Sequence, residues 1–190
     1  MAIRKIARMG NPVLRKMARP LTREEILSPR MQEFVQDMLD TMHEYGGIGL
    51  AAPQVHESIQ LALIEFGEDS ARYPDMGNQS LLVLFNPEVT VLDPGLQAFW
   101  EGCLSVPELR GLVARPRKIR VDYLNEKAEA KTIEAEGFLA TVFQHELDHL
   151  DGTLYVDKLV DPSKLAFTEE FRRYIAPKAP EDGSEEELKD

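Results

Sequence analysis

Apolar residues recur at helical spacing in the first quarter of the chain. After the Ser28-Pro29 pair, a typical N-cap and first helical residue, apolar side chains follow one another at intervals of three and four. These positions are Met31, Phe34, Val35, Met38, Met42 and Tyr45. The pattern predicts an amphipathic helix that ends at Gly46-Gly47. The Asn11-Pro12 pair predicts a short helix upstream by the same capping rule.

The pattern changes between residues 58 and 136 to short apolar runs that are separated by turn residues. Such runs predict strands, here over 61–66, 81–85, 89–92, 112–114, 119–124 and 131–135. The stretch 67–80 is polar and contains Gly, Pro and Asn, so we expect a surface loop there.

The pattern of apolar and polar residues changes again at Gly137. Residues 137–150 are nearly all apolar until a polar cluster at their end, and Gly152 follows as a stop signal, so they predict a buried helix. Another helix is expected over 163–174. Residues 177–190 hold six acidic residues and two lysines, which is typical of a flexible tail that is dispensable for activity.

Length and composition bound the possible classes. A chain of 190 residues with 43% hydrophobic and 29% charged residues suits one globular domain, expected over 1–176. The net charge of −11 repels nucleic acid and anionic lipid, so neither a nucleic-acid nor a membrane partner is expected. The single cysteine excludes an internal disulfide, and the N-terminus lacks the apolar core of a secretory signal. We therefore expect a soluble cytoplasmic protein.

The polar cluster in the third predicted helix carries the first candidate chemistry. In His145-Glu146-Leu147-Asp148-His149 the two imidazoles lie four residues apart, so they share one helix face and can bind one metal ion. The alternative is a pair of structural histidines. That alternative requires two imidazoles and two carboxylates in an apolar helix, which costs several kcal/mol unless something compensates them.

A catalytic metal site needs a third protein ligand and one open position. Glu169, twenty residues after His149, has the spacing found in a large class of zinc proteases and would predict a peptidase. Cys103, within Glu101-Gly102-Cys103-Leu104-Ser105, is the other candidate, although a lone cysteine can equally be a small buried apolar residue. A third segment, Gly46 to Gln54, combines three glycines with a side-chain amide but lacks the Lys-Ser/Thr pair of a phosphate loop.

Taken together, GIGLAAPQ, EGCLS and QHELDHLDG resemble the three ordered motifs of peptide deformylase, a metal-dependent hydrolase that removes the formyl group from nascent bacterial and organellar proteins. The resemblance covers about residues 1–160 and includes the MGNPVLR opening. It implies an α+β domain in which antiparallel strands pack around a central metal-binding helix, with N-terminal and C-terminal helices.

The resemblance also implies roles for individual residues. Cys103, His145 and His149 would bind one divalent ion, iron(II) in cells, with zinc, nickel or cobalt as alternatives. Glu146 would act as general base and acid, and Gln54 with the backbone N–H of Leu104 would stabilise the developing oxyanion. This fits general chemistry, since a divalent ion acidifies bound water and an amide donates without titrating.

The expected substrate is an N-formyl-methionyl peptide, and the nascent chain at the ribosome is its expected source. In the family this peptide lies extended beside the Gly-rich segment. Phe138, Thr141 and Val142 share the helix face of His145 and should form an apolar methionine pocket. The full set of predicted substrate-binding residues is Gly47, Ile48, Gly49, Glu101, Gly102, Arg110, Phe138, Thr141 and Val142. An endopeptidase that uses Glu169 and a catalytically inactive peptide-binding module are the competing interpretations.

Overall fold

The computed structural model describes residues 2–65 and 81–176. Five strands form an antiparallel sheet in chain order, and a sixth short strand pairs with the fourth. The strands are β1 (Gly49–Ala51), β2 (Leu61–Ile64), β3 (Leu82–Cys103), β4 (Val106–Leu124), β5 (Ala130–Glu136) and β6 (Leu165–Phe167). The α-helices are α1 (Arg23–Leu27), α2 (Pro29–Glu44), α3 (Gly137–Asp148) and α4 (Thr168–Glu170).

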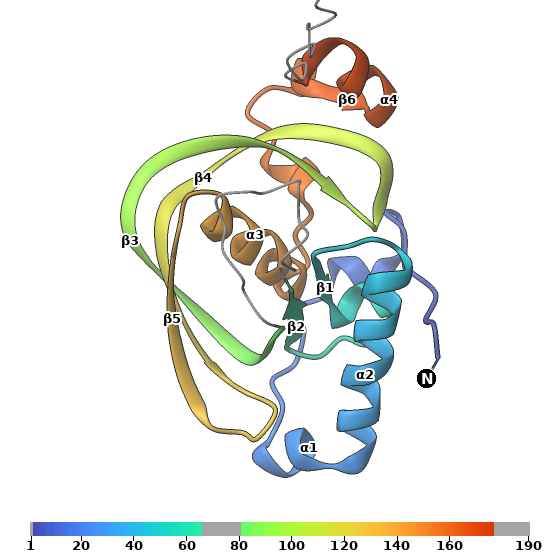
Figure 1. The fold of residues 1–190 in the computed structure, drawn as a ribbon, viewed down its shortest axis with the longest axis vertical. Coiled ribbons are helices and arrows are strands. Elements are labelled where there is room, and N and C mark those ends of the chain that lie inside the picture. The colour runs from blue at the N-terminus through green and yellow to red at the C-terminus, as the bar shows by residue number, and fades with distance from the viewer. Residues whose placement is uncertain (1, 66–80, 177–190) are drawn as a thin grey trace, which may run out of the picture.

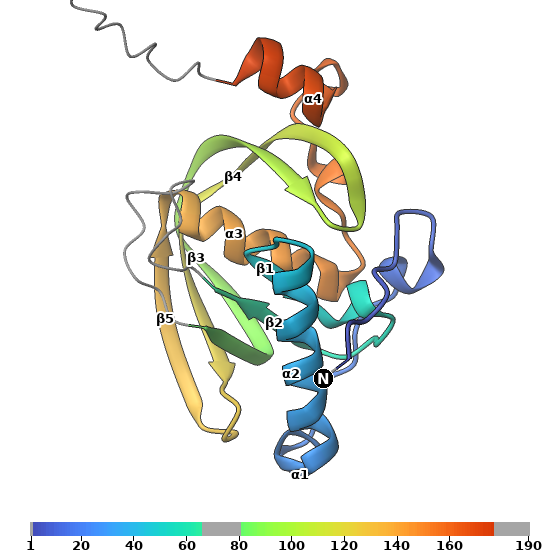
Figure 2. The same cartoon turned by 45° about the vertical axis from the view of Figure 1, so that its right-hand side comes forward.

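Helix α3 lies inside the curve of the sheet, with β3, β4 and β5 on one side and β1 and β2 on the other (Figures 1 and 2). Its apolar side chains Ala140, Phe143 and Leu147 belong to one core with residues of β2 and β4. Beyond the helix, Gly152 has a φ of 71°, the left-handed conformation that favours glycine at a helix end. The predicted α+β arrangement around a central helix is confirmed.

Helix α2 packs on the other side of β1 and β2. Phe34, Met38 and Met42 are buried in a core that also contains Leu50 and Leu61. Ser28 caps the helix by accepting a hydrogen bond from the Met31 backbone N–H. The predicted helix is therefore confirmed, and the Asn11-Pro12 signal is confirmed as a single 3₁₀ turn over Pro12–Arg15.

The predicted strand boundaries between 81 and 124 are wrong, because the short runs are parts of two long strands. Residues 82–85 of the first run and the whole run 89–92 fall within β3, and 112–114 and 119–124 both fall within β4. The pairing register shifts at Phe85/Glu88, Val91/Asp93 and Asp93/Leu96, near Pro87 and Pro94. These irregularities accommodate prolines that would otherwise end a strand. The predicted 67–80 loop lies outside the described residues.

A C-terminal helical segment is confirmed, but its predicted start at residue 163 is wrong. Leu165–Phe167 form β6 and pair with Leu109–Gly111 of β4, and only then do α4 and a π-helical turn over Phe171–Ile175 follow. The backbone N–H and C=O groups of residues 165–167 form hydrogen bonds with those of β4. This tertiary pairing overrides the local preference for a helix. The tail 177–190 lies outside the described residues.

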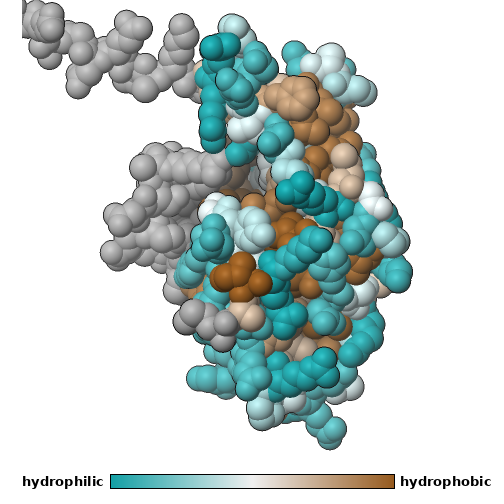
Figure 3. All heavy atoms as spheres, turned by 90° about the vertical axis from the view of Figure 1, so that its right-hand side faces the viewer, coloured by the Kyte–Doolittle hydropathy of each residue, from teal (hydrophilic) through white to brown (hydrophobic). Residues whose placement is uncertain are grey.

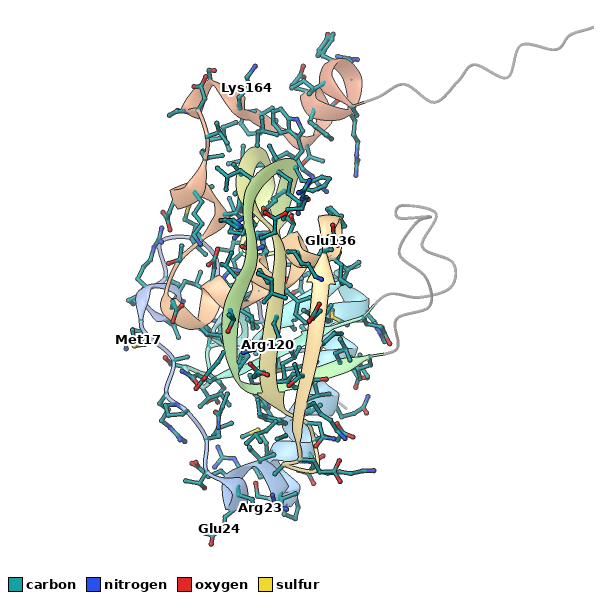
Figure 4. The ribbon with its side chains drawn as sticks, turned by 90° about the vertical axis from the view of Figure 1, so that its left-hand side faces the viewer. Met17, Arg23, Glu24, Arg120, Glu136 and Lys164 are labelled. Carbon is teal, nitrogen blue, oxygen red and sulfur yellow. The ribbon has the colours of Figure 1, made fainter. Side chains whose placement is uncertain are left out.

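The face of β3, β4 and β5 that is turned away from α3 is charged (Figure 4). Along β4, Ile119 and Val121 point inward and are buried, whereas Arg120 between them points outward and pairs with Asp122.

Among the described residues no helix combines the length and the apolar character that a membrane span requires.

Candidate metal centre

A cleft of about 920 Å³ opens along one face of α3. The apolar residues Ala140, Phe143 and Leu147 turn one face of the helix to the sheet, which leaves the opposite face for the cleft. The cleft is lined from α3 by Phe138, Thr141, Val142, His145 and Glu146. The helix therefore supplies both the cleft wall and the polar cluster from one face, as its spacing predicts.

Cys103, His145 and His149 bring their ligand atoms within 4.8 Å of one another. Cys103 ends β3 and pairs with Val106 across the tight turn to β4, which carries its Sγ to 3.3 Å from Nε2 of His149. In a tetrahedral site with bonds of about 2.0–2.3 Å, ligand atoms lie about 3.3–3.8 Å apart, and the contact between Cys103 and His149 falls in this range. Two parts of the chain that are distant in sequence thus bring one sulfur and two imidazoles together.

The electrostatics of the trio favour the thiolate that metal binding requires. Burial raises the pKa of the Cys103 thiol, but His149 and His145 lower it by more, so that this pKa lies well below its usual value. A thiolate beside two imidazoles is a donor set that suits zinc, iron and related divalent ions.

A chain of ions, here called the ion chain (His145, Glu101, Arg115, Asp148 and Lys158), supports one of the imidazoles. His145 Nδ1 donates to Glu101 Oε2 at 2.7 Å, and Arg115 donates to both Glu101 oxygens at 2.6 and 2.9 Å. Arg115 also donates to Asp148 at 2.7 Å, and Lys158 donates to the same carboxylate at 2.6 Å. This arrangement fixes the His145 tautomer and leaves Nε2 as the ligand atom.

Glu146 is buried beside the trio without a cation of its own. Its side chain is 6% exposed, and its Oε2 has no hydrogen-bond partner among the described residues. A Cβ at Gly49 would lie 2.5 Å from Glu146 Oε1, so only glycine permits this approach of β1. Burial is the main cause that raises the pKa of Glu146 to about 7, the range of a general base that works near neutrality.

Gln54 presents an amide N–H₂ group to the same site. Its Oε1 accepts a hydrogen bond from the Ala51 backbone N–H at 2.8 Å, which orients the amide. Its Nε2 lies 3.4 Å from Cys103 Sγ and 3.3 Å from Ser105 Oγ. Leu104 also lines the cleft, one residue after Cys103. Because the hydrogen bond at Oε1 orients the side chain, the Nε2 amide group faces the site. An oxyanion donor needs this arrangement.

The structure brings the predicted substrate-binding residues to the same cleft. All nine line it: Gly47, Ile48, Gly49, Glu101, Gly102, Arg110, Phe138, Thr141 and Val142. Phe138 packs edge-on against Phe99 with ring centroids 5.3 Å apart, which makes this part of the wall aromatic. The Glu101 oxygens are engaged by Arg115 and His145, and substrate contact stays a prediction for all nine residues.

Glu169, the competing third ligand, does not join the trio. It is exposed in α4, and the one group of potential metal ligands found among the described residues consists of Cys103, His145 and His149. The endopeptidase interpretation therefore loses its third ligand.

Sequence reasoning missed two residues that support the centre. Arg115 is 2% exposed and follows the buried Val113 by two positions in β4, so strand alternation was a signal that it points inward and needs a buried anion. Tyr155 is 1% exposed and stacks on His145 with ring centroids 5.9 Å apart and an interplanar angle of 21°. Nothing in the local pattern around Tyr155 indicates this stacking.

Comparison with known proteins agrees with this geometry. A family model described as polypeptide deformylase matches residues 3–165. The peptide deformylase of Leptospira biflexa is 41% identical over 170 residues, which cover 90% of this chain and 95% of that relative.

Solved structures show the same relation. The crystal structure of peptide deformylase from Thermotoga maritima superposes with a TM-score of 0.74 at 37% identity, covering 85% of this chain and 100% of that one. A class I type b peptide deformylase from Acinetobacter baumannii, solved with Met-Ala-Ser bound, superposes with a TM-score of 0.78 at 34% identity, covering 83% of this chain and 99% of that one. Since sequence and fold agree over most of its length, the chain belongs to the peptide deformylase family.

Proposed function

We propose that the chain removes the N-terminal formyl group from formyl-methionyl polypeptides, with formate as the second product. The observation that carries this proposal is geometric: the buried Glu146 carboxylate, whose Oε2 has no partner among the described residues, lies at the cleft beside the Cys103–His145–His149 trio. The family membership of the chain supports the same reaction.

The trio would hold one divalent ion, with iron(II) proposed for the cell and zinc, nickel or cobalt as alternatives. When bound, such an ion supplies Lewis acidity that activates water for attack on the formyl carbon. Glu146 takes one proton from the attacking water and returns it to the amine nitrogen as the bond between the formyl carbon and that nitrogen breaks. Water thereby contributes OH to formic acid and a hydrogen to the free amino group, and the formic acid ionises to formate by releasing its proton.

Gln54 and the Leu104 backbone N–H would bind the formyl oxygen as it becomes negative. A neutral amide suits this role because it donates without losing a proton itself. The amide is already oriented by Ala51, so little reorganisation accompanies the reaction.

The peptide would lie along the Gly-rich segment, with its methionine side chain against Phe138, Thr141 and Val142. The Met-Ala-Ser peptide bound to the Acinetobacter baumannii protein has the composition of a deformylated product, which supports this substrate class. We further propose that the natural substrates are nascent chains at the ribosome in the cytoplasm.

The test is an assay on formyl-Met-Ala-Ser and on an unformylated internal peptide, combined with metal analysis of protein that is purified without oxygen. The proposal expects formate from the first peptide, no cleavage of the second and one ion per chain. Cleavage of the internal peptide without formate release would instead favour an endopeptidase. One ion per chain without turnover of either peptide would favour an inactive binding module.

A further inference from the structure

The C-terminal segment (residues 165–175) forms part of the cleft wall, although the family match ends where this segment begins. Strand β6 fixes the start of the segment to β4, with Phe167 opposite Leu109. The rings of Trp100 and Phe171 then pack with centroids 5.0 Å apart. As a result Thr168 and Arg172 line the cleft. In Figure 3 apolar surface reaches from this segment at the top of the molecule down into its body, with hydrophilic side chains beside it.

Three exposed cations stand along the cleft. Lys5 and Arg8 come from the N-terminal residues and Arg172 comes from the C-terminal segment. The ion pairs found among the described residues give none of these three a carboxylate, whereas the exposed Arg15 and Arg19 are each paired with one. The three cations are thus available to a ligand in the cleft.

The carboxylates of the cleft do not balance these cations. Glu101 is engaged by Arg115 and His145, and Glu146 is buried beside the metal ligands. Among the described carboxylates that line the cleft, only Glu108 is exposed. The outer part of the cleft is therefore positive in a chain whose net charge is −11.

A cluster of charges of the same sign around a cleft concentrates the electrostatic potential there and attracts a ligand of opposite charge. The apolar wall at Phe138 and Val142 suits the methionine side chain, which leaves the charged outer part for the residues that follow it. A long polyanion such as nucleic acid is disfavoured because it would also meet the negative remainder of the surface. An acidic side chain on the peptide itself meets only the cleft.

We propose that Arg172, together with Lys5 and Arg8, selects formyl-methionyl peptides that carry acidic side chains after the methionine. This inference rests on the proposed function and specifies its substrate. Arg172 contributes a rim charge, and rim charges act chiefly on the association rate and its salt dependence. The preference should therefore appear in kcat/KM and weaken as salt is raised.

The test compares kcat/KM for formyl-Met-Ala-Asp-Asp and formyl-Met-Ala-Lys-Lys on the full-length, metal-loaded protein. The wild type should prefer the acidic peptide, and R172Q should reduce the ratio of the two values by about two- to fivefold, as for one exposed ion pair. Raising the salt concentration from 50 to 500 mM should reduce the wild-type ratio in the same direction.

Arg173 provides the matched control, because it is the next residue of the same turn and does not line the cleft. Its guanidinium lies 5.8 Å from the ring centroid of Tyr174. R173Q removes the same charge from the chain and should leave the ratio unchanged. Melting temperatures equal to that of the wild type establish that both variants fold.

Two results would overturn the inference: a wild-type ratio of one, or an equal change of the ratio in R172Q and R173Q. Both leave the proposed function intact, since each requires that formate is released. Absence of formate from every formyl-methionyl peptide, including the neutral formyl-Met-Ala-Ser, would instead contradict the proposed function.

Discussion

Ionic side chains meet in two regions along β4, one buried and one exposed. In the buried region, Arg115 of the ion chain joins Glu101 and Asp148 while it is only 2% exposed. The exposed region holds the exposed pairs, which are defined here as Arg117–Asp93, Lys118–Glu134 and Arg120–Asp122. The contact distances in the two regions are similar, from 2.6 to 3.0 Å, but the surroundings differ.

The difference lies in what replaces a lost partner. Water solvates an exposed ion whose partner is removed, so the exposed pairs contribute little to stability. Glu101 is 5% exposed, so removal of Arg115 would leave its carboxylate poorly solvated next to His145, whereas Asp148 would keep Lys158. The ion chain thus orients His145, whereas the exposed pairs have no such role.

The largest effect should follow at Glu146, a buried carboxylate that has no cation of its own. Glu146→Ala removes the proton carrier but no ligand, so kcat should fall at least ~100-fold while one ion per chain remains. The measurement is formate release at saturating substrate together with metal analysis. The matched control is Glu134→Ala in one of the exposed pairs, which should leave kcat unchanged. Unchanged turnover in Glu146→Ala would refute the role of Glu146.

Arg115→Met compared with Arg117→Met tests the two regions directly. Loss of Arg115 should destabilise the protein by ~3–5 kcal/mol, because Glu101 and Asp148 lose their shared cation. Metal affinity should also fall by about 10- to 100-fold, as for other groups that orient a ligand. The melting temperature and a competitive chelator titration measure the two effects.

Arg117→Met should change neither quantity beyond error, because Arg117 and its partner Asp93 are exposed to water. If the two variants melted at the same temperature and held metal equally well, burial would make no difference between the regions. The comparison would then fail.

The smallest effect is expected for the tail. Truncation after Ala176 removes residues 177–190, in which Leu188 is the one large apolar side chain. These residues can therefore bury little apolar area. Both kcat/KM on a formyl-Met peptide and the melting temperature should stay unchanged within error. A several-fold loss of activity, or a shift of more than a few degrees, would show that the tail contributes to the folded enzyme.

The same contrast explains what the sequence can predict. Local signals were sufficient for α2 and α3, because capping residues and apolar spacing are read along one helix. The candidate metal ligands could also be predicted, since His145 and His149 share a helix face and Cys103 lies in a recognisable motif. Their convergence within 4.8 Å agrees with that prediction.

What the sequence could not predict depends on partners far along the chain. Pro87 and Pro94 indicate strand ends, but bulges between β3 and β4 accommodate them. The residues 165–167 form a strand because β4 offers them backbone partners. Tyr155 acquires its place on His145 only when the chain returns after α3.

The central claim is that Cys103 completes the metal centre, and metal content per chain tests it most directly. Cys103→Ser and Glu169→Ala are purified without oxygen beside the wild type, and iron, zinc, nickel and cobalt are quantified in each. The claim predicts about one ion per chain in the wild type and in Glu169→Ala, and loss of metal and of formate release in Cys103→Ser. Retention of metal in Cys103→Ser with its loss in Glu169→Ala would contradict the claim.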